Sequence, residues 1–293
     1  MFETIGQNIV SGVLVGALYG LAALGLSLVF GVLKVLNIAH GELIMLGGYA
    51  AFWIFNLYGI DPFFGLLLVI PLLFMVGWVL HKGLFSAVVK SDEEERIKNS
   101  MLIGFGLTLI LQSLAIQLWT ADERSITTAY ATASLELAGI RLPVVRLAGL
   151  IIALLAVIGL ELFMNRTYWG KAMRATAENW ETASLTGINI QKIYLMTFAL
   201  SAALAGVAGT LVSVSFSVNP AIGLSWTLKA LIVVVLAGLG SIPGTLLAGV
   251  LLGVAESASA YLVGGAYREL VGLFLFLIIL SIRPQGLFGG GRG

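Results

Sequence analysis

Residues 7–33 read QNIVSGVLVGALYGLAALGLSLVFGVL, a stretch without a single Asp, Glu, Lys or Arg. About 20 predominantly apolar residues are enough for a helix to cross the hydrocarbon core of a bilayer, so this stretch predicts a membrane-spanning helix. Eight further runs follow it, each with at most one or two ionisable residues: 43–58, 63–81, 99–119, 147–164, 193–217, 220–240, 243–263 and 267–282. Membrane helices are therefore expected along the whole chain.

The composition supports this prediction. Of the 293 residues, 59% are hydrophobic and only 11% are charged, and the mean hydropathy is +1.03, which does not fit a water-soluble domain. The absence of cysteine excludes a disulfide framework, a cysteine zinc cluster and a thiol nucleophile, and a net charge of +1 argues against a nucleic-acid partner. We expect an all-α integral membrane protein, a single transmembrane domain over residues 1–293 built as a polytopic bundle of eight to nine membrane segments.

Basic residues in the connecting segments predict the orientation. Residues 82–98 and 165–192 each carry four Lys or Arg residues, which resist translocation, so both segments should be cytoplasmic. The C-terminal end, with Arg283 and Arg292, should be cytoplasmic for the same reason. Nine crossings then place the N-terminus outside. Because the first basic residue is Lys34, a cleaved secretory signal is not expected.

The remaining polar segment, residues 120–146, must then lie outside. Leu135 to Val145 could form a short hairpin within it. The segment is either a docking surface for an external partner or a plain connector, and its residues favour neither.

Several glycines recur at the spacing of helix contacts. Gly12, Gly16 and Gly20 lie four residues apart in the first run, and Gly249 and Gly253 do so in the eighth. Small residues at this spacing let two helix backbones approach closely within a membrane. We expect them to pack a tight bundle.

The first interruption, residues 34–42, brings Asn37, His40, Gly41 and Glu42 between two apolar runs. Polar and ionisable groups near membrane depth are costly and are kept for pathways or structural pairing. If the segment is a helix break buried in the bundle, free N–H groups after it could face a substrate carboxylate, and Glu42 could meet an ammonium group. If it is a cytoplasmic turn, the same residues only cap two helices. Hydropathy does not separate these two readings.

The second interruption, residues 238–244, contains Ser241 and precedes the helix that carries Glu256. Gly249, Gly253 and Glu256 fall on one helix face, so Glu256 should face protein and not lipid. Both interruptions follow an apolar helix, break at a polar residue and resume as a glycine-containing helix. This similarity suggests broken or re-entrant helices in an inverted pseudo-repeat.

The cytoplasmic segment should contain its own helix. Residues 172–183 are rich in alanine and predict a helix that Gly187 or Asn189 could end. On such a helix Arg174, Glu178 and Glu181 would share one face. The segment is either a solvated connector or a docking element for a cytoplasmic partner.

Four stretches together resemble a known family: Phe30-Gly31-Val32 through Asn37-Ile38-Ala39-His40-Gly41-Glu42 to Gly48-Tyr49, the loop from Arg174-Ala175 through Ala183 to Gly187-Ile188-Asn189, the turn Gly240-Ser241-Ile242-Pro243-Gly244 with Glu256, and the ending Arg283-Pro284-Gln285-Gly286-Leu287-Phe288-Gly289. In this order, and over nearly the whole chain, they resemble the branched-chain amino acid permeases of ABC importers, the LivHM permease family, and its LivH-like members most. That family is usually counted with one helix fewer, so one of the nine runs could be re-entrant.

The resemblance implies a multi-pass permease subunit of the inner membrane. Its implied partners are a second, LivM-like permease, two cytoplasmic ATPase subunits and an extracytoplasmic substrate-binding protein, with no cofactor on this chain and ATP used by the partners. The coupling role of the family's cytoplasmic helix would fall on Gly170, Arg174, Ala177, Ala183 and Gly187, together with Glu178 on the same predicted face. Relatives also carry urea, short amides or other amino acids.

The residues themselves agree that the chain has no ATPase site. Gly170-Lys171 lacks the remainder of a phosphate-binding loop, because Asn165 and Ala172 stand where a glycine and a hydroxyl residue are needed. A metal site is improbable and no catalytic constellation stands out. We expect an importer permease for branched-chain or other apolar amino acids, with a urea or amide permease as the alternative.

A second hypothesis is an ion-coupled carrier that uses His40, Glu42 and Glu256 as proton-exchanging groups. For either transporter the expected pathway residues are Asn37, His40, Gly41, Glu42 and Ser241. Glu256 is expected to be a structural or gating group beside them.

Overall fold

The structure is a computed structural model that describes residues 2–89, 92–137, 139–262 and 264–288. Residues 90 and 91 of the polar segment 82–98, with Gly289 and Arg292 at the C-terminal end, lie outside the described residues. The elements in chain order are α1 (Phe2–Leu33), α2 (His40–Tyr58), α3 (Pro62–Leu80), the π-helix η1 (His81–Phe85), α4 (Ser86–Val88), α5 (Glu93–Trp119), β1 (Ser134–Leu137), β2 (Ile140–Pro143), α6 (Val144–Arg166), α7 (Tyr168–Glu178), α8 (Trp180–Leu185), α9 (Ile190–Ser215), α10 (Ile222–Ala237), α11 (Ile242–Leu262), the 3-10 helix η2 (Gly265–Tyr267) and α12 (Arg268–Ile282).

Every predicted apolar run contains a helix, and the chain is an all-α polytopic membrane protein. Within the described residues, seven helices are long and apolar enough to cross a membrane: Glu3–Leu33, Pro62–Val88, Glu94–Trp119, Val144–Arg166, Ile190–Ser215, Ile242–Leu262 and Gly265–Ile282. The other two runs form α2, which begins with polar residues, and α10, whose 16 residues span only about 24 Å. The expected eight to nine spans are therefore not confirmed, and the inverted pseudo-repeat stays a prediction.

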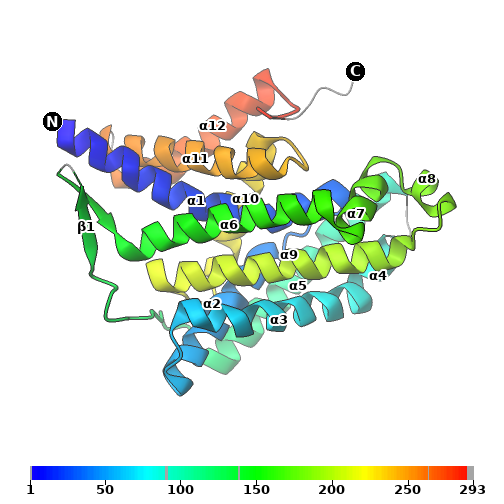
Figure 1. Ribbon diagram of the computed structural model, residues 1–293, viewed down its shortest axis with the longest axis horizontal. Coiled ribbons are helices and arrows are strands. Elements are labelled where there is room, and N and C mark those ends of the chain that lie inside the picture. Colours follow the sequence, from blue (N-terminus) through cyan, green and yellow to red (C-terminus); the bar gives the residue numbers. More distant parts are fainter. Residues whose placement is uncertain (1, 90–91, 138, 263, 289–293) are drawn as a thin grey trace.

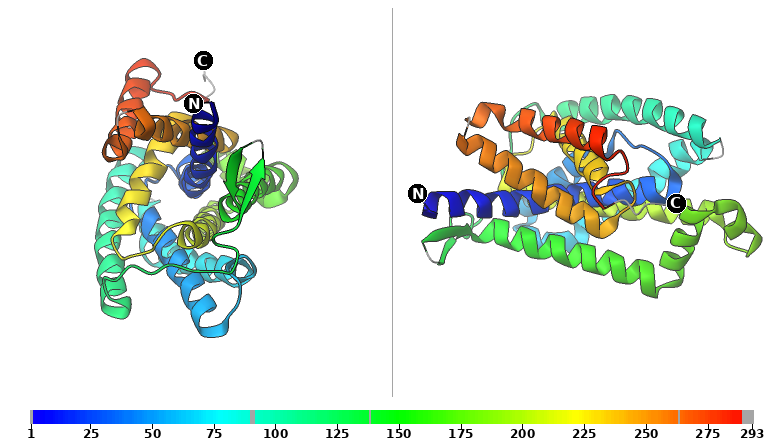
Figure 2. Two further views of the ribbon diagram at one scale, coloured as in Figure 1. Left: turned by 90° about the vertical axis from the view of Figure 1, so that its left-hand side faces the viewer. Right: turned by 90° about the horizontal axis from the view of Figure 1, so that it is seen from above.

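The helices form an elongated bundle with α1 and α9 at its centre (Figures 1 and 2). Nearly every side chain of α1 from Leu14 to Leu33 is buried, and most of α9 is buried as well. In the long helices α3, α5, α6 and α12, by contrast, most residues are not fully buried. In a bilayer these exposed side chains can meet lipid, so only the central helices need protein on all sides.

The predicted glycine contacts join α1 to α11. A Cβ added to Gly16 would lie 2.5 Å from the carbonyl oxygen of Gly249, and one added to Gly12 would lie 2.7 Å from the Cα of Val254. Ordinary side-chain contacts need more than 3.4 Å, so these backbones touch directly. The prediction that the two glycine series pack a tight bundle is confirmed, and the contact holds Glu256 against α1.

A similar contact places α2 against α9. A Cβ on Gly47 would lie 2.7 Å from the Cα of Gly206, and one on Gly77 of α3 would lie 2.5 Å from the Cβ of Ala202. Helices α2 and α3 thus both pack against small residues of α9. This packing fixes the first turns of α2 inside the bundle.

The two ends of the bundle carry different structures. The predicted hairpin is confirmed: β1 and β2 pair antiparallel from Ser134 with Pro143 to Leu137 with Ile140. It lies beside the N-terminal end of α1, where the Gln7 side chain donates to the carbonyl oxygen of Arg141 at 2.8 Å. Helices α7 and α8 lie at the opposite end (Figure 1).

Candidate functional site

The first interruption folds back into the protein. Asn37, His40 and Glu42 are only 2%, 0% and 1% exposed, so the segment is a buried helix break and not an exposed turn. Nε2 of His40 lies 2.9 Å from the carbonyl oxygen of Ala22, roughly three turns before the end of α1. The chain therefore starts α2 deep beside α1.

The start of α2 is closed by hydrogen bonds within the protein. The N–H of Ala39 donates to Oδ1 of Asn37 at 3.1 Å, and the N–H of Gly41 donates to Oγ1 of Thr227 on α10 at 2.9 Å. The N–H groups of residues 40, 42 and 43 donate to carbonyl oxygens of residues 37 and 39. The expectation of free N–H groups facing a substrate is therefore wrong in this conformation, because Asn37, Ala39 and Thr227 supply acceptors for these N–H groups.

Two buried polar atoms at this break lack partners. Nδ1 of His40 and Oε2 of Glu42 form no hydrogen bond with any described residue. Glu42 lies against α10 so closely that a Cβ on Gly223 would overlap its carboxylate, and a Cβ on Gly41 would overlap the carbonyl oxygen of Gly223. Most buried polar groups in folded proteins are paired, so unpaired ones mark this crossing of α2 and α10 as a candidate functional position.

The second interruption borders a large cavity at the α7 end of the bundle. Gly238 and Gly240 have φ values of +92° and +90°, which lets α10 end and α11 begin within a few residues. Ser241 then lines a cavity of about 1030 Å³ together with Arg174, Ala177 and Glu178. Ser241 is thus brought close to α7 of the polar segment 165–192, and Asn37, His40 and Glu42 do not line this cavity.

The C-terminal stretch closes one side of the same cavity. The N–H of Leu287 donates to the carbonyl oxygen of Leu236 at 2.8 Å, and the N–H of Phe288 donates to that of Ala237 at 3.1 Å. Gly286, with φ +80°, lies directly against the backbone of Gly238. The tail therefore pairs with carbonyl groups that the end of α10 leaves without helical partners.

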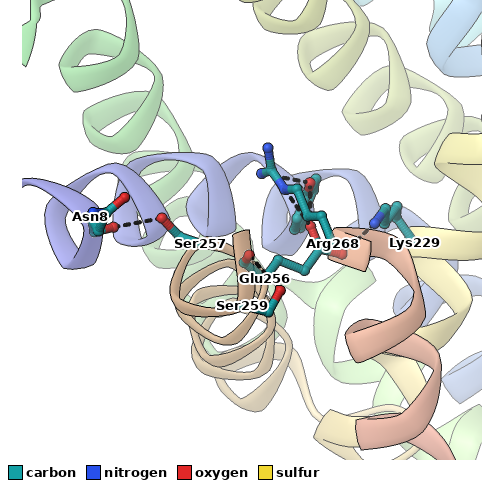
Figure 3. Close-up of polar contacts among 7 residues, drawn as sticks. Asn8, Lys229, Glu256, Ser257, Ser259 and Arg268 are labelled. Atoms are coloured by element: carbon teal, nitrogen blue, oxygen red, sulfur yellow. Dashed lines mark hydrogen bonds and ion pairs between the residues drawn. The ribbon is translucent and has the colours of Figure 1, made fainter. Parts of the chain in front are cut away.

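Glu256 lies in a charge network between four helices (Figure 3). It is fully buried, which confirms that it faces protein. Its carboxylate accepts hydrogen bonds from the hydroxyl of Tyr19 on α1 at 2.9 Å, from Nζ of Lys229 on α10, and from Nε of Arg268 on α12 at 3.1 Å. These contacts join α1, α10, α11 and α12 at one point.

The polar segment 165–192 forms two helices where one was expected. Asn179 adopts φ −155° and ψ 105°, which ends α7, and its Oδ1 accepts from the N–H of Thr182 at 2.8 Å to begin α8. The continuous helix over 172–183 is therefore wrong, and Glu181 does not share a helix with Arg174. The reason is that an asparagine side chain can cap a new helix in place of continuing the old one.

The predicted coupling residues differ in their surroundings. Gly170 and Ala183 are buried, and Gly187 has φ +86° in the turn after α8. Arg174 donates to Oδ1 of Asn165 at 2.6 Å, which holds α7 against the end of α6. Leu185, at the end of α8, is 87% exposed.

The polar segment 120–146 is anchored to the bundle by two polar side chains. The hydroxyl of Tyr130 donates to Oδ2 of Asp61 at 2.5 Å, and burial together with this hydrogen bond raises the pKa of Tyr130 to about 12. The guanidinium of Arg124 lies 5.5 Å and 5.4 Å from the ring centres of Phe52 and Trp53. The segment is therefore bound along the ends of α2 and α3.

The sequence analysis did not identify the three residues that bind Glu256. Lys229 is the only charged residue of the run 220–240, and a lone charge in a membrane segment is a usable signal. Arg268 stands next to Glu269 at the start of the last run, and Tyr19 is one aromatic residue within a long apolar helix. For Arg268 and Tyr19 the sequence contains no such signal, because contacts between four separate helices produce no pattern along the chain.

Comparison with known proteins agrees with this architecture. The family model described as "Branched-chain amino acid transport system / permease component" matches residues 8–281. The chain is 32% identical to the high-affinity branched-chain amino acid transport system permease protein BraD of Pseudomonas aeruginosa, over 97% of this chain and 95% of that protein. It is 30% identical to the corresponding permease protein LivH of Escherichia coli, again over 97% and 95%. It is 27% identical to the probable branched-chain amino acid transport permease protein LivH of Methanocaldococcus jannaschii, over 99% and 95%. The chain therefore belongs to the family of permease components of branched-chain amino acid transport systems.

Proposed function

We propose that this chain is the membrane-spanning permease subunit of an ATP-driven importer for branched-chain amino acids. It would act in the inner membrane with a second, LivM-like permease, two cytoplasmic ATPase subunits and an external substrate-binding protein. The ATP would be bound and used by the partners and not by this chain. The α7 end of the bundle and the C-terminus would face the cytoplasm, and the hairpin end would face outward.

The observation that carries this proposal is the exposed apolar end of the α7–α8 unit. Trp180 is 47% exposed and Leu185 is 87% exposed on a unit that also exposes charged side chains and lies at one end of the bundle. Exposed aromatic and aliphatic side chains of this kind serve as anchors in protein interfaces. Because α7 also borders the 1030 Å³ cavity, a partner that moves this unit would change the shape of the cavity.

The buried break of α2 and the cavity beside Ser241 are the proposed parts of the pathway. Asn37, His40, Gly41 and Glu42 lie between α1 and α10, and Ser241 lies closer to the proposed cytoplasmic end. Alternating access would connect them when α10 moves relative to α2. The unpaired atoms of His40 and Glu42 would then meet water or substrate.

The decisive test substitutes Leu185 in the complete importer, reconstituted in vesicles with its ATPases and binding protein. Leu185→Glu should reduce substrate-stimulated ATP hydrolysis and leucine uptake at least ten-fold, because buried anchors in interfaces contribute about 2 kcal/mol or more. Leu185→Met keeps an apolar side chain and should retain both activities. Arg174→Glu should also abolish stimulation, through loss of the contact with Asn165 that positions α7.

Full stimulation in an intact Leu185→Glu complex would refute the docking role of α8. Uptake assays with leucine, urea and acetamide separate the proposed substrate from the amide alternative. If urea or acetamide is accumulated and leucine is not, the amino acid assignment fails.

A second candidate function is an ion-coupled carrier, favoured by the buried unpaired atoms of His40 and Glu42. Such a carrier would accumulate substrate under a proton gradient without ATP or partners. Uptake by the purified chain alone in liposomes would establish this function. Uptake only when ATP and the ATPases are present would exclude it.

A further inference from the structure

The charge network around Glu256 contains more positive than negative charge. One carboxylate is shared by Lys229 and Arg268, and within the described part of the chain neither cation forms a salt bridge with a second carboxylate. An uncompensated charge inside a membrane protein is costly, because the surrounding medium cannot solvate it. The network is therefore suited to receive a further anion.

The cations lie on the accessible side of the network. The Glu256 side chain is 0% exposed, whereas the side chains of Lys229 and Arg268 are 14% and 36% exposed. In Figure 3 the two cations approach the carboxylate from α10 and α12 on different sides. An anion that arrives from outside the chain would meet the ammonium and guanidinium groups before it met Glu256.

A row of largely buried aromatic rings continues from the cations. The rings of Tyr19 and Trp226 are 5.7 Å apart, and those of Trp226 and Phe216 are 6.3 Å apart. The guanidinium of Arg146 lies 5.8 Å from the centre of the Phe216 ring. Cationic groups beside apolar rings match a ligand that combines a carboxylate with a hydrocarbon side chain.

We propose that Lys229 and Arg268 receive the carboxylate of an apolar amino acid during transport, in exchange for the carboxylate of Glu256. This inference rests on the proposed function and names the groups that would recognise the substrate. When Glu256 is displaced, its bonds to α10 and α12 are released. Substrate binding would thereby loosen the junction of the four helices.

The experiment measures equilibrium binding of radiolabelled leucine to the assembled importer in phosphatidylcholine vesicles, without binding protein and without ATP. Lys229→Gln should weaken binding roughly ten-fold or more, because one charge-assisted contact is removed, and Lys229→Arg should restore most of it. Glu256→Gln should tighten binding, since the internal competitor is lost. Lys98→Gln, which alters an exposed pair with Glu94, is the matched control and should bind as wild type does.

Competition experiments identify the recognised group. 4-Methylpentanoate keeps the carboxylate and should displace leucine, whereas leucinol lacks the carboxylate and should not. Absence of leucine binding, equal competition by leucinol, or unchanged affinity in an assembled Lys229→Gln complex would overturn the inference. Displacement by added phosphatidylglycerol but not by 4-methylpentanoate would assign the cations to lipid and overturn it as well. ATP-driven leucine uptake in the same vesicles after addition of the binding protein tests the proposed function separately.

Discussion

Replacement of Gly16 by alanine tests the contact between α1 and α11. The new Cβ would lie 2.5 Å from the carbonyl oxygen of Gly249 and 2.6 Å from the Cα of Val250. Both atoms belong to the backbone, so no side chain can rotate away. To restore an ordinary contact distance of at least 3.4 Å from the carbonyl oxygen of Gly249, the two helices must separate by about 0.9 Å.

The cost of this separation has two parts. Overpacking in a well-packed interior costs about 1–3 kcal/mol. The same movement stretches the 2.9 Å hydrogen bond from Tyr19 to Glu256, and a hydrogen bond to a charged group contributes about 1.5–3 kcal/mol. We therefore expect Gly16→Ala to lower the free energy of unfolding by roughly 2.5–6 kcal/mol.

The measurement is the fraction of detergent-solubilised protein that stays monodisperse after heating, compared with Gly159→Ala. Gly159 lies within α6, and a Cβ there would meet nothing within 4 Å, so this control should be neutral or slightly stabilised. A Gly16→Ala protein as heat-resistant as the Gly159→Ala control would show that the two helices are not in direct backbone contact.

Three further results are expected. The pKa of Tyr130 is raised from 10.0 to about 12, so its contribution to the stability of the segment 120–146 is complete below pH 10 and lost as the pH rises toward 12. Limited proteolysis should detect this loosening in the wild type as faster cleavage above pH 10. The Tyr130→Phe variant lacks the bond to Asp61, so it should be cleaved faster than the wild type at neutral pH, and its cleavage rate should change little between pH 10 and pH 12. Gly41→Ala should yield little monodisperse protein, because its Cβ would overlap α10; a normal yield would contradict the tight crossing. Gly286→Ala should release the C-terminal tail, since φ is +80° there, and the C-terminus should become more accessible to carboxypeptidase; unchanged accessibility would show that the tail is not held by this turn.

Local patterns predicted the helical elements and some of their contacts. Hydropathy is a local property of the sequence, so the nine apolar runs could be recognised, and each of them contains a helix. The four-residue glycine spacing identified the surfaces of α1 and α11 that touch. The hairpin was also recognisable. The division of the segment 165–192 into two helices at Asn179 was not recognisable, because its alanines favour a continuous helix. The break depends on the capping hydrogen bond of one asparagine side chain.

The candidate site was predictable only in part. Asn37, His40 and Glu42 stood out as polar residues between apolar runs, and the structure buries all three. Ser241 was grouped with them by resemblance of two interruptions, yet it lines a cavity beside α7 that these three residues do not line. Chemical similarity of two breaks carries no information about their distance in space.

By itself the sequence determined that this is a helical membrane protein with two polar interruptions, because hydropathy and helix propensity depend on neighbouring residues. Only the tertiary structure decided that the first break is buried, that α2 and α10 meet at Gly41 and Gly223, and that Glu256 is shared by Lys229 and Arg268. The physical reason is that burial and charge pairing are set by contacts between segments far apart in the chain. Those contacts depend on which helices pack together, and the residue pattern of a single helix does not identify the helices that pack against it.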